Sequence, residues 1–346
     1  MSTTENKGFH GLLCEDHPYI FVDGCMQAWP DADLSQAHRH GVTAYSVTAW
    51  MPHASLEEAL EGIMYWHLAA RRCPELGIAR QVEDVRTAKK EGKATLLLAA
   101  QCGDFVGRKI HRIEAFYHLG LRMMIFAYNA QNQLAGGCLD VTSSGLSRLG
   151  RLALAECNRV GMVLDCSHLS RHSSLEIIDR SLTPVVFSHS GAKAIVDNPR
   201  NIDDEQIRAC ANRDGVVGLV SWGPLCLKAE QAGWPGLDDF IDQIDHVVQL
   251  TGSSRHVGVG TDMSLGTYPD HEMEPWGDAG YPSASARYDA VVTSDIRSPR
   301  RSLREFHDYA QVINLVAKLK KRGYDPEDIA GILGENFLRV FEQVWK

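Results

Sequence analysis

Polar side chains that can bind a metal or move a proton follow several short apolar runs of the chain. His168 and His189 each come soon after such a run, and Asp262 follows a third. An imidazole can offer a ring nitrogen to a divalent cation, and a carboxylate can carry protons in a hydrolytic reaction. The three residues indicate a metal-assisted reaction. An alternative of equal weight is that each histidine only caps a helix or forms a structural hydrogen bond.

Further polar groups end other apolar runs. Cys25 and Gln27 are two residues apart, so both face the same side if the segment stays extended. A Cys25 thiolate is compatible with three roles: a metal ligand, a nucleophile or a packed core residue. Gln101 follows a later run, and Tyr128 and Asn129 follow the next one. Amide and hydroxyl groups at such places can polarise a carbonyl or orient a substrate.

The elements that must position these groups form a repeating pattern, since eight apolar runs of strand length alternate with longer amphipathic segments. The runs lie at 19–23, 42–49, 94–100, 121–127, 161–166, 184–188, 215–221 and 256–260. Helices are predicted at 31–40, 55–72, 82–91, 109–119, 145–159, 170–180, 203–213, 237–250 and 302–322. Nearly continuous apolar strands are typical of a parallel sheet covered on both faces. The pattern predicts an α/β fold, a (β/α)8 TIM barrel, with an open doubly wound sheet as the alternative.

In such a barrel the active site lies where the strands end, so the polar residues above would meet at one face. The 346 residues fit a single domain over 1–346. After the eighth run, the segment 264–301 carries Gly, Pro, Tyr and Trp. We expect it to be a long loop that serves as a lid, a specificity wall or an oligomer contact.

The composition excludes some classes of protein. A formal net charge of -9 is unsuited to a protein that binds the backbone of a nucleic acid. No apolar run is long enough to span a bilayer, and the start MSTTENKGFHG lacks the pattern of a secretory signal. The nine cysteines are scattered without a C-x-x-C pair, as expected of reduced thiols. We therefore expect a cytoplasmic protein that acts on a small molecule, without membrane or nucleic-acid partners.

Several segments resemble the membrane dipeptidase family, in the family's order and over nearly the whole chain. In 182–220, LTPVVFSHSGAKAIVDNPRNIDDEQIRACANRDGVVGLV, a histidine is followed by S-x-A and N-P-R-N, as in that family. Similar segments are YHLGLRMMIFAYNAQN (117–132), LDCSHLS (164–170), HVGVGTDM (256–263) and RGYDPEDIAGILGENFLRVF (322–341). The resemblance implies a barrel of the amidohydrolase, or metallo-dependent hydrolase, type and a homodimer.

The same resemblance implies roles for four residues. Active members of the family hold two zinc ions that share a carboxylate, and metal-bound hydroxide attacks a peptide carbonyl. His168 and His189 match two of the metal ligands, and Asp262 matches the residue that transfers protons. Arg200 matches the residue that binds the carboxylate of the substrate.

The other metal positions of the family differ in this chain. The family's D-G-H-x-D reads DGCMQ at 23–27, which puts Cys25 and Gln27 in place of two ligands, and Gln101 replaces the bridging glutamate. Tyr128 replaces a substrate-facing histidine. Two dications repel at close range, and neutral glutamines cannot offset that repulsion. We therefore expect one zinc ion, or none. The expected ligands of that ion are His168, His189 and deprotonated Cys25.

Three functions remain open. The first is a dipeptidase-like hydrolase with one metal ion, acting on a small carboxylate-bearing amide, lactam or related C–N bond; Tyr128 or Gln101 would polarise the carbonyl. Ordinary dipeptidase activity is not expected. The second needs no metal: Cys25 is a nucleophile, or Asp262 and Tyr128 catalyse a proton-transfer or lyase reaction. The third is a barrel that only binds. The residues expected to contact the substrate are Arg200, Asn129 and Gln27.

His53, His67 and His111 could bind metal by residue type alone, but their predicted positions in helices or loops favour surface roles. Asp104 follows the replaced bridge and would have to bend inward to supply an anionic ligand.

Overall fold

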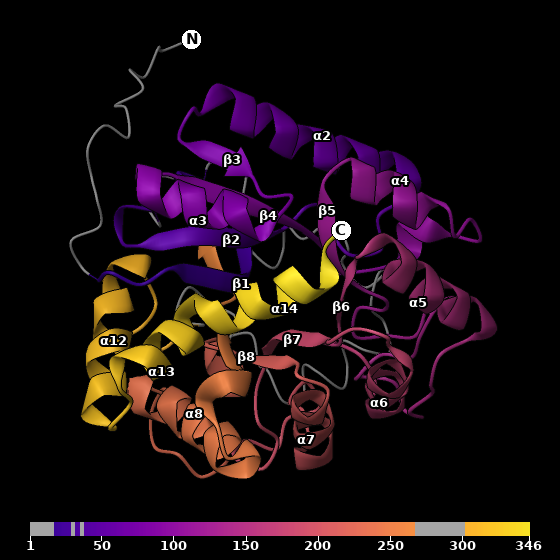
Figure 1. Ribbon diagram of the computed structural model, residues 1–346. Helices are drawn as coiled ribbons and strands as arrows, with labels where there is room; N and C mark the ends of the chain where they lie inside the picture. Colours follow the sequence, from indigo (N-terminus) through magenta and orange to yellow (C-terminus); the bar gives the residue numbers. More distant parts are fainter. Residues whose placement is uncertain (1–16, 29–31, 35–37, 267–301) are drawn as a thin grey trace.

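The computed structural model describes residues 17–28, 32–34, 38–266 and 302–346. Most of the predicted loop at 264–301 and part of the predicted helix at 31–40 lie outside these residues. Within them, a parallel sheet of 10 strands curls around an apolar interior, and helices surround it (Figure 1).

All eight apolar runs form strands of this sheet. They are β1 (Phe21–Ala28), β2 (Val42–Thr48), β4 (Ala94–Ala100), β5 (Leu121–Ile125), β6 (Val163–Asp165), β7 (Val186–Ser190), β8 (Val216–Val220) and β9 (Val257–Gly260). The sequence does not predict two short strands: β3 (Leu76–Ile78), which pairs with β4, and β10 (Met263–Leu265).

The two ends of the sheet meet. The strand order is β10-β1-β2-β4-β5-β6-β7-β8-β9, and β10, which follows β9 directly in the chain, pairs in parallel with β1. At this junction the backbone N–H of Asp262 donates to the carbonyl oxygen of Cys25 at 2.8 Å. The N–H of Thr261 donates to the buried carboxylate of Asp23, also at 2.8 Å. The sheet is thus the predicted (β/α)8 barrel.

Helices cover the barrel, and side-chain caps fix the start of some of them. The helices are α2 (Leu56–Arg72), α3 (Val82–Glu91), α4 (Arg112–His118), α5 (Arg148–Val160), α6 (Arg171–Arg180), α7 (Asp204–Asn212), α8 (Leu237–Thr251) and α12 (Val312–Lys321). Ser55, Ser170 and Asp203 accept hydrogen bonds from first-turn N–H groups of α2, α6 and α7. Among the helices of the described ranges, none has the length and apolarity needed to cross a bilayer.

The prediction of one helix over 302–322 is wrong in its first part. Leu303 and Phe306 are buried and form an isolated bridge, and helical structure begins only at Tyr309–Gln311, a 3-10 turn that leads into α12. Asp308 fixes this start, because its side chain accepts from the N–H of Ala310 at 2.8 Å.

The last helices close the amino-terminal end of the barrel. They are α13 (Pro326–Ala330), a π-helical turn (Gly331–Glu335) and α14 (Asn336–Val344), which crosses the strands in Figure 1. Asn336 donates to the carbonyl oxygen of Val257, the first residue of β9, at 2.8 Å. Phe337 is fully buried, and a Cβ at Gly258 would lie 2.4 Å from its ring. Only glycine leaves room for that ring.

Candidate functional site

The predicted site residues all lie at the carboxyl ends of the strands. Cys25 and Gln27 are on β1, which stays extended as far as Ala28. The remaining ones are Gln101 after β4, Tyr128 and Asn129 after β5, His168 after β6, His189 on β7, Arg200 after β7 and Asp262 between β9 and β10. Their contacts divide them into two groups, one around the histidines and one around Cys25.

The histidine group brings two imidazoles together. Nε2 of His168 lies 2.9 Å from Nε2 of His189, and both side chains are buried. Burial lowers the pKa of both rings well below the usual value, and the positive charge of Arg200 lowers each further. Both imidazoles are therefore neutral, which is the form that binds a cation.

The tautomer of His189 follows from its neighbours. The Ser188 hydroxyl donates to the buried carboxylate of Asp165, so its oxygen accepts from Nδ1 of His189 at 2.6 Å. The ring proton of His189 is thus on Nδ1. Its Nε2 carries a lone pair that faces His168, and Ser188 and Asp165 hold the ring in this orientation.

Nδ1 of His168 has two competing partners. The Nε–H of Arg200 points at it from 3.0 Å, and the side-chain oxygen of Asn129 lies 2.7 Å away. An unprotonated Nδ1 accepts from Arg200, whereas a protonated Nδ1 donates to Asn129. The ring of Tyr128 stacks on His168 with centroids 4.0 Å apart. Asn129 and His168 both have positive φ, at 60° and 64°, conformations that are uncommon outside glycine and that place both side chains at this point.

Arg200 is a buried cation with neutral partners. Its side chain is 4% exposed, and besides His168 it donates to the hydroxyl of Ser190 at 3.2 Å and to the carbonyl oxygen of His189 at 2.9 Å. In the part of the chain that the structure describes, no carboxylate lies within 4.0 Å of this guanidinium. A buried charge of this kind is normally balanced by an anion.

The second group surrounds the thiol of Cys25. Nε2 of Gln101 donates to its sulfur at 2.9 Å, and the thiol faces Oδ1 of Asp262 at 3.8 Å. Gln27 donates to the same oxygen of Asp262 at 2.9 Å, while its own carbonyl accepts from Ser264 at 3.1 Å. Burial, and then the negative charge of Asp262, raises the pKa of Cys25 well above the usual value. Cys25 is therefore a thiol here, and Asp262 is held by an amide.

A small cavity lies between the two groups. It is lined by residues of both, including Cys25, Gln101 and His189, and its volume is about 10 Å³. This is room for about one water molecule, and such a water would be in reach of a thiol, an amide and an imidazole.

The residues of the site fit one cation better than two. Two neutral imidazoles with facing nitrogens suit a single zinc ion. Gln27 and Gln101 add no negative charge, and the protonated Cys25 donates to Asp262. Within the described residues, Cys25, His168 and His189 do not form a group whose ligand atoms all lie within 4.8 Å of one another.

A different set of three possible ligands does lie this close together. His53, Cys102 and Asp104 have ligand atoms within 4.8 Å of one another, at the ends of the neighbouring strands β2 and β4. The hydrogen bond that His53 donates to Asp104 raises the pKa of His53 to about 10. From the sequence, His53 and Asp104 are separate candidates, and Cys102 is only one of nine scattered cysteines. The signal that could join them is that β2 and β4 are consecutive among the predicted strands, so their carboxyl ends adjoin.

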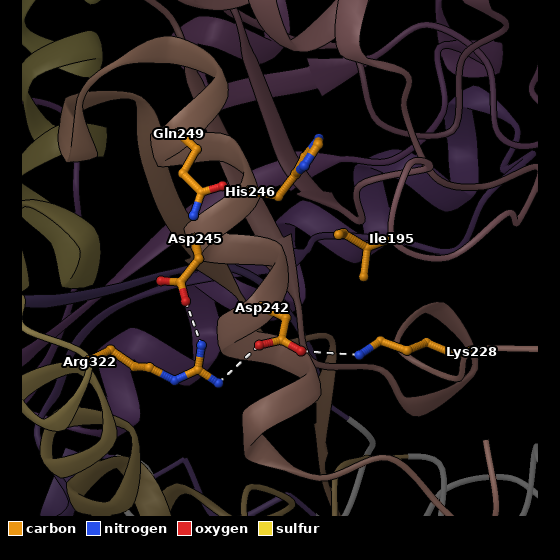
Figure 2. Close-up of a pocket in the computed structure, with 7 residues that line it drawn as sticks. All are labelled: Ile195, Lys228, Asp242, Asp245, His246, Gln249 and Arg322. Atoms are coloured by element: carbon orange, nitrogen blue, oxygen red, sulfur yellow. Dashed lines mark hydrogen bonds and ion pairs between the residues drawn. The ribbon is translucent and has the colours of Figure 1, made fainter.

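A larger cavity, of about 360 Å³, lies elsewhere, on the outside of α8. Figure 2 shows that its charged side chains are paired with one another: Arg322 binds Asp242 at 2.9 Å and Asp245 at 2.5 Å, and Lys228 binds Asp242 at 3.0 Å. Because these charges are balanced, we interpret the residues around this cavity as an ion-pair network that links α8 to its neighbours.

Comparison with known proteins yields one family. The sequence pattern of the membrane dipeptidases (peptidase family M19) matches residues 27–278 and 291–346. An uncharacterised dipeptidase of Schizosaccharomyces pombe is 31% identical over 232 residues, 66% of this chain. The dipeptidase tcpJ of Claviceps purpurea is 25% identical over 295 residues, 84% of this chain. The chain covers 48% and 61% of the lengths of these two relatives.

A solved structure agrees with this result. An amidohydrolase from Pseudomonas aeruginosa is 28% identical and superimposes with a TM-score of 0.85, covering 96% of this chain and 99% of its own. The similarity therefore includes nearly all of both chains.

Proposed function

The chain belongs to the membrane dipeptidase family, and from that premise we propose that it hydrolyses a C–N bond in a small molecule with a free carboxylate, such as an amide or a lactam, using one metal ion. The residues proposed to act in this reaction are His168, His189, Cys25, Arg200, Asp262, Tyr128, Gln101, Asn129 and Gln27.

The observation that carries the proposal is the buried Arg200. Its three partners are neutral, so its charge is unbalanced until an anion arrives. A substrate carboxylate can accept two parallel hydrogen bonds from a guanidinium, which is a geometry that few other groups provide. The position of Arg200 beside His168 would hold such a substrate over the strand ends where His189 and Cys25 line the cavity.

The cation proposed here is a single zinc ion. His168 and His189 would hold it, with Cys25 as a third ligand once its thiol loses its proton. When bound, zinc supplies Lewis acidity to the scissile carbonyl and makes water a better nucleophile at neutral pH. Gln27 and Gln101 supply no charge to offset a second dication, which favours one ion.

His168 couples the two halves of the reaction. If its Nε2 held the cation, the ring proton would be on Nδ1, which would donate to Asn129 instead of accepting from Arg200. The Nε–H of Arg200 would then be available to the substrate carboxylate. Tyr128, stacked on His168, limits the direction in which the ring can move.

We assign proton transfer to Asp262. Gln27 donates to its Oδ1, which orients the carboxylate that would take a proton from water and return it to the leaving nitrogen. Gln101 lines the same cavity and could donate to the carbonyl oxygen.

The alternative in which Cys25 is a nucleophile has less support. A nucleophilic cysteine needs a lowered pKa, and burial together with Asp262 raises that of Cys25.

The test compares substrates that differ only in the carboxylate. We expect zinc-loaded protein to cleave N-acyl amino acids or lactams with a free carboxylate and to act poorly on the corresponding amides. In Arg200→Gln, kcat/KM for the carboxylates should fall roughly 10- to 150-fold, because about 1.5–3 kcal/mol of charged hydrogen bonding is lost, while the amides change little.

Arg122→Gln is the matched control. Arg122 is also buried, but it donates to backbone carbonyls, including those of Tyr117 and Arg80, at the amino end of β5. Its loss should cost stability and leave the preference for carboxylates intact. An equal fall on both substrate types in Arg200→Gln would contradict the proposal.

A further inference from the structure

We propose that His53, Cys102 and Asp104 form a second metal site, which binds one borderline-soft divalent cation such as zinc at the rim of the barrel. This site is separate from the pair formed by His168 and His189. It does not depend on the proposed function.

The three ligand atoms converge on one point. Nδ1 of His53 lies 2.7 Å from Oδ2 of Asp104, the sulfur of Cys102 lies 3.3 Å from the same oxygen, and sulfur and Nδ1 are 3.9 Å apart. Nitrogen, thiolate and carboxylate are the three ligand types that zinc prefers in proteins. Together they would place two negative charges against the dication.

The arrangement is unsuited to a Cys–His–Asp relay. A relay needs one ring nitrogen on the thiol and the other on the carboxylate. Here the same nitrogen, Nδ1 of His53, faces both Cys102 and Asp104. Nδ1 of His53 and the thiol of Cys102 both donate to Oδ2 of Asp104, so a cation bound here would replace the protons that lie between these atoms.

The distances need only a small adjustment. Zinc bonds of about 2.0–2.3 Å in a tetrahedron place ligand atoms roughly 3.4–3.6 Å apart. The sulfur distances are already close to this range, and only the contact between His53 and Asp104 must open. The side chain of His53 is 33% exposed, so part of its ring borders solvent.

Asn132 supports the site from behind. Its side-chain oxygen accepts from the N–H groups of Leu134 and Ala135, at 2.9 and 3.2 Å, so its Nδ2 must point the other way. That Nδ2 donates to Oδ1 of Asp104 at 2.8 Å. Asp104 is thus fixed with Oδ2 directed at Cys102 and His53, as second-sphere groups fix the ligands of known metal sites.

The backbone also holds these ligands in place. His53 has φ 66°, an uncommon conformation for a residue with a Cβ, and it follows β2 just before the cap of α2. Cys102 follows β4, and Asp104 begins a 3-10 turn. Tyr128 lies between this site and the inner one, since its ring contacts His53 at 6.3 Å and His168 at 4.0 Å between centroids.

The test uses Co²⁺ as the probe, because a cobalt–thiolate bond gives a charge-transfer band in the near ultraviolet. Full-length protein, freed of metal, is titrated with Co²⁺ without other ligands. We expect the band to lose intensity in Cys102→Ser. In Cys25→Ser, the part of the band that comes from the rim site should remain. The matched control is Cys73→Ser, since Cys73 is half-buried and also faces a carboxylate, that of Glu75 at 3.7 Å.

A second variant guards against misfolding of Cys102→Ser. His53→Gln changes an exposed side chain, and it should weaken Co²⁺ binding at the rim by at least about tenfold, since even a supporting residue contributes 10–100-fold. A band unchanged in Cys102→Ser would overturn the rim site and leave the proposed hydrolase untouched. If the protein shows no preference for substrates with a carboxylate while the cobalt band behaves as expected, only the proposed hydrolase is overturned.

Discussion

Gln27 and Gln101 give the site around Cys25 a different chemistry from that of two carboxylates, because an amide can donate a hydrogen bond as well as accept one. Gln101 donates to Cys25, and Gln27 donates to Asp262 while accepting from Ser264. A carboxylate in either place would repel Asp262. Gln27 thus orients the carboxylate of Asp262, and Gln101 orients the thiol of Cys25.

A carboxylate at position 101 should make the protein depend on metal. In Gln101→Glu the new charge is buried beside Cys25 and Asp262, so we expect the metal-free protein to lose about 1–3 kcal/mol of stability. Zinc should restore the lost stability, and it should raise Tm by more than it does in the unchanged protein. The measurement is thermal unfolding with a chelator and with zinc.

The control for that prediction is Gln131→Glu, which adds the same charge at an exposed position. If both variants respond to zinc alike, position 101 does not face the cation.

The sequence predicts which residues gather at the strand ends, but only part of how they pair. His168 and His189 follow neighbouring strands, so their proximity follows from strand order. The partners of Cys25 depend on side-chain directions at the irregular pairing of β1 with β2, which no spacing reveals. Cys102 was not predicted as a ligand because its type and burial match ordinary core cysteines.

At the level of elements, the eight strands are predictable because buried parallel strands are apolar along their whole length. The short β3 and β10 carry too few residues for such a signal. The wrong helix start has another cause: Leu303 and Phe306 are apolar at a spacing of three, which imitates one turn of a helix. The sequence prediction also omits α13 and α14.

Asp214 ties α14 to the barrel. It pairs with Arg255 at 3.1 Å and with Arg339 at 2.8 Å, and it accepts from Gln343 at 3.0 Å. Burial raises the pKa of Asp214, but these donors outweigh burial and hold it below the usual 3.8. A carboxyl with a lowered pKa in the folded state stabilises the protein above 3.8 and loses that contribution as the pH falls through its folded value.

Asp214→Asn should therefore destabilise the protein at neutral pH by up to about 1 kcal/mol, because the ion pairs are partly exposed. The difference from the unchanged protein should shrink under acid conditions, below pH 3.8. Urea unfolding at neutral and acid pH measures this. Asp197→Asn removes a more exposed pair, with Lys193, and should have a smaller effect at either pH.

At the scale of the whole molecule, Phe337 joins the last helix to the interior of the barrel. It packs with residues from several strands, among them Val22, Val186 and Val216. Phe337→Ala should lower the free energy of unfolding by about 3–5 kcal/mol, because it leaves a cavity in the sealed end of the barrel.

Urea unfolding checks this, with Leu152→Ala as the control. Leu152 is 54% exposed on α5, so its truncation should change stability by less than about 0.5 kcal/mol. Equal effects of the two substitutions would show that Phe337 does not seal the barrel.

The single domain over 1–346, the homodimer and the cytoplasmic location stay predictions.

The position of α14 also matters while the chain is being made. Every barrel strand precedes Phe337, so on the ribosome the strands emerge before the ring that fills the space left by Gly258. Until then the amino-terminal end of the nascent barrel presents apolar side chains to water, a state open to chaperones and to aggregation. A translational pause before α14 would prolong that exposure.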